Sequence, residues 1–204
     1  MRLAGSLALA LALSACGPSD SPQAQPTRAA APGSSSSWAA NTLAPAVAAR
    51  ASLALDAEGL RLVAPDTGRT TLLAFGAERG QVEQAVQRAI GTSPDRFTGE
   101  ECPAGPTQFA RFGELQLAFQ DDRWIGWALN GEDKHTTLDG IGIGTTRREA
   151  EASRAVTAIP ESTLGDEFVL ASPEQEAAIG GMFSGPGGDA RIEYLWAGVA
   201  CNFR

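Results

Sequence analysis

Two stretches of this chain share one local pattern at an interval of 68 residues, from position 75 to position 143. In each stretch an apolar residue and a glycine precede a short polar segment that ends in arginine: Phe75-Gly76-Ala77-Glu78-Arg79 and Ile143-Gly144-Thr145-Thr146-Arg147. A pattern that recurs at a fixed interval indicates duplication of one structural unit. We therefore expect two related units, at residues 76–129 and 140–204.

Each unit starts with an amphipathic helical pattern. In the first unit, apolar residues recur at the spacing of one helix face, and Gly91 provides a stop signal. In the second unit, Thr146 and Glu149 match a capping box, and the apolar stripe predicts a helix that continues almost to Pro160. The apolar positions are Val82, Ala85, Val86, Ala89 and Ile90 in the first stripe, and Ala152, Ala155, Val156 and Ile159 in the second.

Short extended runs fill the rest of the folded part. Residues 51–75 contain three such runs separated by turn residues, which predicts an antiparallel meander. Asp121-Asp122 separates two further runs and predicts a hairpin. Three runs are expected in each unit, at 108–112, 114–120 and 123–129 in the first and at 168–171, 179–183 and 190–196 in the second. The predicted fold class is α+β, with tandem helix-plus-antiparallel-sheet repeats whose helices pack on one sheet face.

The N-terminus has the layout of a secretory signal. One positive charge at Arg2 precedes an uncharged apolar run of about eleven residues, whereas about 20 are needed to cross a bilayer as a helix. The next residues, Leu13-Ser14-Ala15-Cys16, resemble the bacterial lipobox. The resemblance implies a signal peptide at 1–15, cleavage before Cys16, and palmitate-type acylation that anchors the protein to a membrane. The alternative is an ordinary signal peptide with an incidental cysteine.

The segment from Cys16 to Ser37 contains mostly Pro, Ser, Ala and Gln, which predicts a disordered tether. Residues 38–204 are expected to form a single domain. Because Gly17 is not aspartate, resemblance to Gram-negative lipoproteins favours the outer membrane, facing the periplasm. The chain carries 24 acidic and 16 basic residues. With Lys134 as its one lysine, it lacks the basic footprint of a nucleic-acid-binding protein.

The cysteine pattern fits an oxidising compartment. With Cys16 assigned to the lipid, Cys102 and Cys201 remain, and an isolated pair in an exported domain predicts a disulfide. Two free thiols are the alternative. Glu100 and Glu101 lie near Cys102, but they have neither a histidine nor the ligand spacing of a zinc site. We expect no metal and no cofactor.

Catalytic motifs are incomplete in this sequence. The run Gly140-Ile141-Gly142-Ile143-Gly144 lacks the third glycine of a dinucleotide-binding fingerprint. Ser184 lies in a near match to the G-x-S-x-G motif of hydrolases. His135, the single histidine, has no nucleophile that the sequence identifies. The prediction is a non-enzymatic protein, and a hydrolase that uses Ser184 or His135 is the alternative.

Three tryptophans offer a candidate interaction surface. Trp124, Trp127 and Trp196 lie on predicted strands, with Arg123 and Arg191 nearby. Tryptophan and arginine are typical anchors of protein interfaces. On the usual burial of aromatic side chains, however, we favour the alternative that these rings fill the core.

The repeated approach to a helix, followed by antiparallel strands, resembles the modules of the beta-lactamase inhibitory protein and of the SmpA/OmlA outer-membrane lipoproteins. Three phrases, Gly59–Val63, Gly140–Arg147 and Leu195–Cys201, are also similar to alphaproteobacterial lipoproteins without an assigned activity. The resemblance covers about residues 51–204 and implies a lipid-anchored, protein-binding envelope module. A sensor or carrier of small apolar ligands is a further alternative, and it would need a cavity between helix and sheet.

Overall fold

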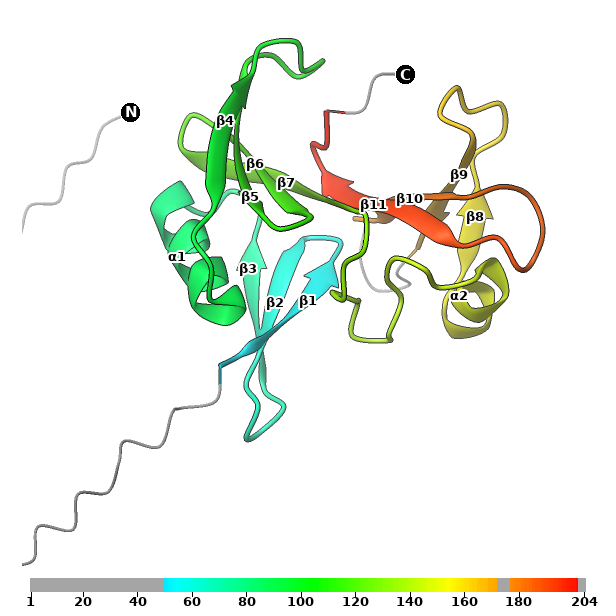
Figure 1. The fold of residues 1–204 in the computed structure, drawn as a ribbon, viewed down its shortest axis with the longest axis horizontal. Coiled ribbons are helices and arrows are strands. Elements are labelled where there is room, and N and C mark those ends of the chain that lie inside the picture. The colour runs from blue at the N-terminus through cyan, green and yellow to red at the C-terminus, as the bar shows by residue number, and fades with distance from the viewer. Residues whose placement is uncertain (1–49, 172–176, 202–204) are drawn as a thin grey trace, which may run out of the picture. The chain divides into compact units, whose positions relative to one another are not determined.

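The computed structural model describes residues 50–171 and 177–201. The described part contains two antiparallel sheets and two helices (Figure 1). The elements are β1 (Ser52–Asp56), β2 (Gly59–Val63), β3 (Thr70–Ala74), α1 (Arg79–Ile90), β4 (Asp95–Gly99), β5 (Thr107–Phe112), β6 (Leu115–Gln120), β7 (Arg123–Asn130), α2 (Arg147–Ser153), β8 (Val156–Ala158), β9 (Asp166–Leu170), β10 (Ile179–Phe183) and β11 (Ile192–Gly198).

Most of the strands belong to one large sheet. It has eight strands in the order β4-β5-β6-β7-β11-β10-β9-β8, so β7 and β11 are neighbours at its centre. The predicted meander of residues 51–75 is confirmed as a separate three-stranded sheet of order β1-β2-β3. This small sheet and α1 lie on the same side of the large sheet (Figure 1), and α1 contacts β1, β5 and β7.

The predicted fold class is wrong. The described chain is mostly β, with helices of 12 and 7 residues, and it is not a tandem repeat of helix plus sheet. The strands expected to form two units combine into one continuous sheet. The core face of the large sheet is covered mainly by the β1-β2-β3 sheet and α1, and α2 contributes a single buried residue, Ala150, to the core.

The second helix ends earlier than the sequence predicts. It ends at Ser153, and Val156–Ala158 form strand β8 instead of continuing the helix. Pairing of β8 with β9 satisfies the backbone of these residues, and β-branched Val156 and Thr157 favour a strand. Of the predicted stripe, Ala152 and Ala155 are exposed. The pairing of β8 with β9 therefore outweighs the helical spacing of the apolar residues in this segment.

Local sequence signals explain the other element boundaries. Gly91 adopts a φ of 89° after α1, and its amide donates to the carbonyl of Gln87, as expected for a helix C-terminus. Thr146 and Glu149 form the predicted capping box at the start of α2. Asp121 and Asp122 adopt φ values of 49° and 56° in the β6–β7 turn, a conformation that aspartate tolerates.

The two stretches with the shared pattern have matching backbone contacts. The Gly76 amide donates to the Trp124 carbonyl at 2.7 Å, and the Gly144 amide donates to the Ile192 carbonyl at 2.8 Å. Likewise, the amides of Arg79 and Arg147 each donate to a carbonyl in a hairpin of the large sheet, at 2.9 and 2.8 Å. The likeness therefore lies in the way in which the chain approaches each helix from the sheet.

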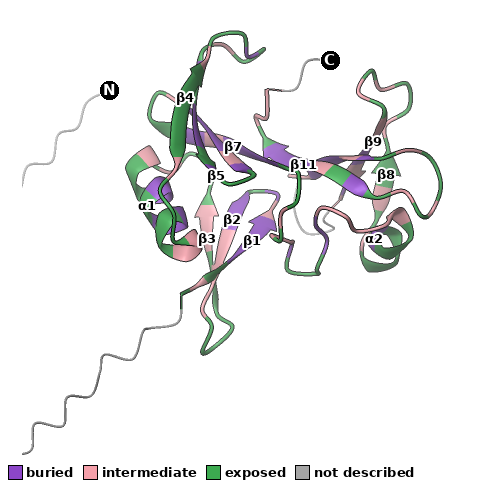
Figure 2. Cartoon of the chain, viewed as in Figure 1, coloured by how far each residue is buried: buried purple, intermediate pink, exposed green. Residues whose placement is uncertain are grey.

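The core lies between the large sheet and its covering elements. Side chains from one face of the large sheet pack there with those of α1 and the small sheet, and Figure 2 shows buried residues along the central strands while α2 is mostly exposed. One row of aligned positions crosses six neighbouring strands on this face, and all but the glycine supply buried side chains: Phe112, Leu115, Leu129, Leu195, Gly181 and Phe168. The other face of the large sheet is therefore the one available for function.

Candidate functional site

The face of the large sheet that points away from the core is covered by no helix or strand of residues 50–171 and 177–201 (Figure 1). One row of cross-strand partners runs across all eight strands on this face. The row consists of Asp95, Arg111, Gln116, Ala128, Trp196, Gly180, Val169 and Thr157. Because side chains alternate between faces along a strand, Phe97, Phe109, Tyr194 and Met182 point to the same side. We call this surface the open face.

Two of the three tryptophans lie in the core. Trp124 and Trp127 are both 0% exposed. The Trp124 indole N–H donates to the Gly126 carbonyl at 2.8 Å, and that of Trp127 donates to the Asp56 carbonyl at 3.0 Å. The second bond ties the large sheet to β1. Neither ring is accessible, so the interpretation of these two as core residues holds and they cannot form an interaction surface.

Trp196 belongs to the open face but is only 7% exposed. Its ring lies flat over Gly180, where an added Cβ would fall 2.4 Å from the Trp196 Cε2 atom. Arg123 and Arg191 are exposed, and each donates from Nη1 to a carbonyl before a helix, that of Gly76 or Gly144. These two arginines therefore hold the segments that precede α1 and α2, and they do not form a group with the Trp196 ring.

Two aromatic pairs lie on the open face. Phe97 stacks on Phe109 with ring centroids 5.0 Å apart, and the Arg111 guanidinium lies 5.8 Å from the Phe97 centroid. Tyr194 and Trp196 are in contact at 5.1 Å. Phe97 is 42% exposed, which is high for a large apolar side chain. The first pair therefore presents apolar surface to solvent beside a cation.

The Cys102 and Cys201 sulfur atoms lie 2.06 Å apart, at bonding distance, as the sequence predicts. Cys102 lies in the β4–β5 loop, and Cys201 follows β11. Gly198, with a φ of 67°, turns the chain out of β11 toward this loop. The pair thus joins two segments at one border of the open face, and we call this region the cysteine corner.

Two hollows flank the cysteine corner, and both are lined by Cys102 and Cys201. The larger, of about 450 Å³, is mostly apolar and includes Phe109, with Glu100 and Glu101 also in its lining. The smaller, of about 200 Å³, includes Pro103, Trp196 and Val199. The corner therefore adds two recesses to the aromatic surface.

A third hollow on the open face is polar. It has a volume of about 160 Å³ and is lined by Arg111, Glu114, Gln116, Ala128, Asn130 and Tyr194. Burial raises the pKa of the Tyr194 hydroxyl, which therefore stays protonated at neutral pH. The hollow thus combines a cation, a carboxylate, two amides and a neutral phenol, all able to form hydrogen bonds with a polar partner.

The two candidate catalytic residues occupy separate parts of the fold. Ser184 follows β10, and its hydroxyl accepts a hydrogen bond from the Arg191 amide at 3.0 Å, which closes the β10–β11 hairpin. His135 lies between β7 and α2, with Nδ1 2.5 Å from Asp133 Oδ1. In the described part of the chain no hydroxyl or thiol lies within hydrogen-bonding distance of the His135 ring. The structure does not bring Ser184 and His135 into one hydrogen-bonded site.

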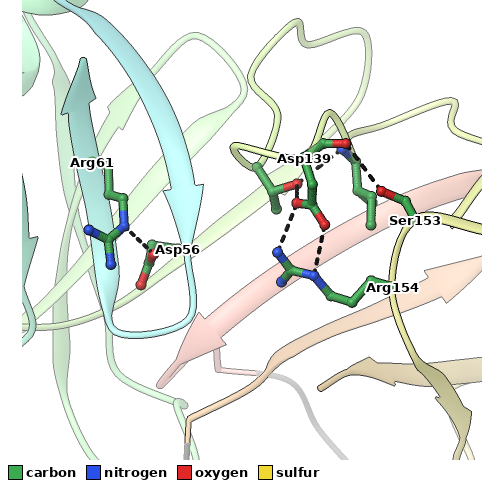
Figure 3. Close-up of polar contacts among 7 residues, drawn as sticks. Asp56, Arg61, Asp139, Ser153 and Arg154 are labelled. Carbon is green, nitrogen blue, oxygen red and sulfur yellow. Dashed lines mark hydrogen bonds and ion pairs between the residues drawn. The ribbon is translucent and has the colours of Figure 1, made fainter. Parts of the chain in front are cut away.

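Carboxylates outside the open face are held by basic groups. Burial would raise the pKa of Asp133, but hydrogen bonds from His135 outweigh it and hold the pKa below its usual value. For Asp139, burial is outweighed in the same way by bonds from Thr137 and Arg154. Figure 3 shows Arg154 on both Asp139 oxygens, at 2.8 and 2.9 Å. These ionised, paired carboxylates stabilise the connector between β7 and α2.

A second such group anchors α1 to the large sheet. Glu83 is 7% exposed and accepts hydrogen bonds from Arg79 at 2.7 Å and from Arg96 at 2.6 Å. Burial acts to raise the Glu83 pKa, but these bonds outweigh it and lower the pKa. Arg79 also donates to Gln108 and lies over the Phe119 ring. The cluster is satisfied internally and fixes α1 against β4, β5 and β6.

In residues 50–171 and 177–201, no group of three His, Cys, Asp or Glu side chains is arranged to hold a metal ion. No described helix is both long and apolar enough to span a bilayer. The predicted signal peptide, tether and acylated Cys16 lie outside the described residues.

Comparisons with known proteins give no match: no family model, curated protein or solved structure is significantly similar to this chain. The resemblance to inhibitor and lipoprotein modules therefore stays a prediction.

Sequence reasoning missed the most exposed part of the candidate surface. Phe97 lies in β4, between the predicted helix end at Gly91 and the run at 108–112, where no strand was predicted. A signal was present, because the Asp95–Gly99 run contains Phe and Thr between Pro94 and a glycine. Phe109, Arg111 and Tyr194 lay on predicted strands, but only the sheet order brings them to the same face as Phe97.

Proposed function

We propose that this chain is an exported, lipid-anchored, non-enzymatic envelope protein that binds another protein through its open face. The observation that carries the binding part is the exposed Phe97 side chain, stacked on Phe109 at 5.0 Å next to the cysteine corner. Exposed aromatic rings beside recesses, with arginine at the border, are typical of the anchor positions of protein interfaces.

The chemistry of the surface favours a particular kind of partner. The larger recess is mostly apolar, and Glu100 and Glu101 in its lining have no ion pair among the described residues. A partner segment with an apolar side chain flanked by Lys or Arg would complement both properties. The net charge of −8 acts in the same direction by favouring basic partners.

Two observations support export and anchoring. The sulfur atoms of Cys102 and Cys201 lie at bonding distance, and disulfides persist in exported proteins but are rare in the cytosol. The N-terminal run that ends at Cys16 is similar to a lipobox. Acylation of Cys16 would hold the domain at the outer membrane, facing the periplasm, and the 16–37 segment would give it reach.

Site-specific photo-crosslinking in cells tests the binding proposal. A photoreactive phenylalanine analogue would replace Phe97 on the open face or, as the control, exposed Asp66 in the turn between β2 and β3. We expect a discrete crosslinked product with one envelope protein from position 97 and none from position 66. Equal products from both positions, or none from position 97, would contradict the proposal.

Intact-mass measurement tests the anchoring proposal. The wild-type chain should be shortened to begin at Cys16 and should carry the mass of added acyl chains. A Cys16→Ser variant should lack these chains and should leave the membrane fraction. An unmodified cysteine in the mature wild-type chain would show an ordinary signal peptide instead.

A further inference from the structure

Two adjoining hollows lie along the second half of α1, and none of their lining residues belongs to the open face. One, of about 380 Å³, is mostly apolar and lies between α1, Leu62 of β2 and the two residues that precede β1. The other, of about 480 Å³, is polar and includes Gln84, Gln87 and Gly91. Arg50 and Arg88 line both hollows, so these two arginines lie at the boundary between the apolar hollow and the polar hollow.

These two arginines have no partner among residues 50–171 and 177–201. Neither Arg50 nor Arg88 forms an ion pair or a side-chain hydrogen bond with any described residue, and no carboxylate lines either hollow. In contrast, Arg61, Arg79 and Arg154 each bind a carboxylate. A guanidinium offers five N–H donors in a fork that matches a carboxylate or phosphate. The pair is therefore suited to an external anion.

Of the two arginines, only Arg88 has an evident structural role. Arg88 lies in the last turn of α1, where a positive charge offsets the negative end of the helix. Arg50 comes from outside the helix and reaches over Gly91, where an added Cβ would fall 1.8 Å from the Arg50 Nη1 atom. The Gly91 surface thus leaves room for the Arg50 guanidinium beside Arg88.

The lining of the apolar hollow indicates that the ligand has an apolar chain in addition to its negative charge. Its remaining lining consists of Ala51, Leu62, Ala85 and Ala89, which supply only small or aliphatic side chains. We propose that this site binds one acyl chain of an amphiphile with an anionic head: the chain lies in the apolar hollow, and the head binds Arg50 and Arg88. This would be a second binding site, independent of the protein-binding face.

Three probes that differ in one property each test the site by NMR on the full-length chain. Octanoate has both the anionic head and the chain, 1-octanol lacks the charge, and butanoate lacks most of the chain. We expect octanoate to shift the backbone amide signals of Ala51, Ala85, Ala89 and Gly91. The affinity for octanol and for butanoate should be at least about fivefold weaker, because charge-assisted hydrogen bonds and buried methylenes both contribute.

Substitutions then assign the binding. Arg50→Gln/Arg88→Gln, at exposed positions, should weaken octanoate about fivefold or more and leave octanol unchanged. Ala89→Trp should weaken octanoate by filling the hollow. Arg111→Gln, an exposed arginine of the open face, is the matched control and should leave octanoate affinity unchanged.

Sedimentation with lipid vesicles distinguishes a bilayer lipid from a free amphiphile as the ligand. A Cys16→Ser chain, with and without Arg50→Gln/Arg88→Gln, is sedimented with phosphatidylglycerol or phosphatidylcholine vesicles. Arginine-dependent sedimentation with phosphatidylglycerol alone would identify a bilayer lipid, and octanoate binding without sedimentation would identify a free amphiphile. Both results support the site.

The proposal would be overturned if octanol or butanoate bound as tightly as octanoate, if the double arginine variant bound octanoate normally, or if the shifted signals lay at the cysteine corner. None of these results bears on the crosslinking from position 97, so failure of this site and failure of the protein-binding proposal are distinguishable.

Discussion

Removing the bond between Cys102 and Cys201 should destabilise the domain substantially. The two cysteines are 99 residues apart in sequence, so the bond closes most of the folded chain into one loop. The chain-entropy treatment gives about 4.7 kcal/mol for a loop of about 100 residues, because the cross-link reduces the freedom of the unfolded chain. Measured losses are typically about 2–4 kcal/mol. We expect a Cys102→Ala/Cys201→Ala variant to lose about 3–4 kcal/mol of unfolding free energy.

Urea unfolding followed by tryptophan fluorescence measures this loss, since Trp124, Trp127 and Trp196 are all buried in the folded state. The dependence of the free energy on urea should be steeper for the variant, because its unfolded chain exposes more surface. Wild-type protein in reductant should match the variant. A loss below about 1 kcal/mol, or a wild type insensitive to reductant, would refute both the bond and the entropic reasoning.

Three further predictions concern packing and charge. Glu83→Gln should cost about 1–2 kcal/mol at pH 7. The Glu83 pKa is lower in the folded than in the unfolded chain. The stabilisation by ionised Glu83 is therefore fully present above the ordinary glutamate pKa of 4.5 and is lost as the pH falls through the folded-state pKa. The urea unfolding curves of wild type and variant should accordingly converge in acid. Gly180→Ala, which would press a methyl group into the Trp196 ring, should cost about 1–3 kcal/mol in urea unfolding; an unchanged midpoint would contradict the packing. Asp139→Asn should weaken the Arg154 ion pair and speed hydrogen exchange of the Arg154 amide, which bonds to Ala150 at 2.8 Å; unchanged exchange would show that the pair does not hold the end of α2.

Signals between residues close in sequence predicted most of the strands and one helix. The turn residues between 51 and 75 mark a meander in which each strand pairs with the next, so no distant information is needed. The stripe of Val82, Ala85 and Val86 and the stop at Gly91 similarly define α1. The Asp121-Asp122 hairpin follows from the ability of aspartate to adopt a positive φ.

Pairing between separate strands determines the features of the fold that local sequence patterns do not predict. The spacing around Val156 is compatible with a helix, but β8 forms because β9 offers a partner strand. Joining β7 to β11 merges two expected units into one sheet, and no local pattern in either strand specifies that contact. The order and register of the whole sheet place Trp127 on the core face and Phe97 on the open face, so the candidate surface could be identified only from the sheet order.

Complementation of a strain that lacks the gene tests whether this protein works by binding through the open face and not by catalysis. Four variants would be compared, each at wild-type abundance: Phe97→Glu, with control Asp66→Lys, and Ser184→Ala and His135→Ala. We expect that only Phe97→Glu fails to restore the wild-type phenotype, because a buried charge in the interface abolishes binding. Full complementation by Phe97→Glu, together with failure of Ser184→Ala or His135→Ala, would rule out binding through the open face as the function and favour a hydrolase.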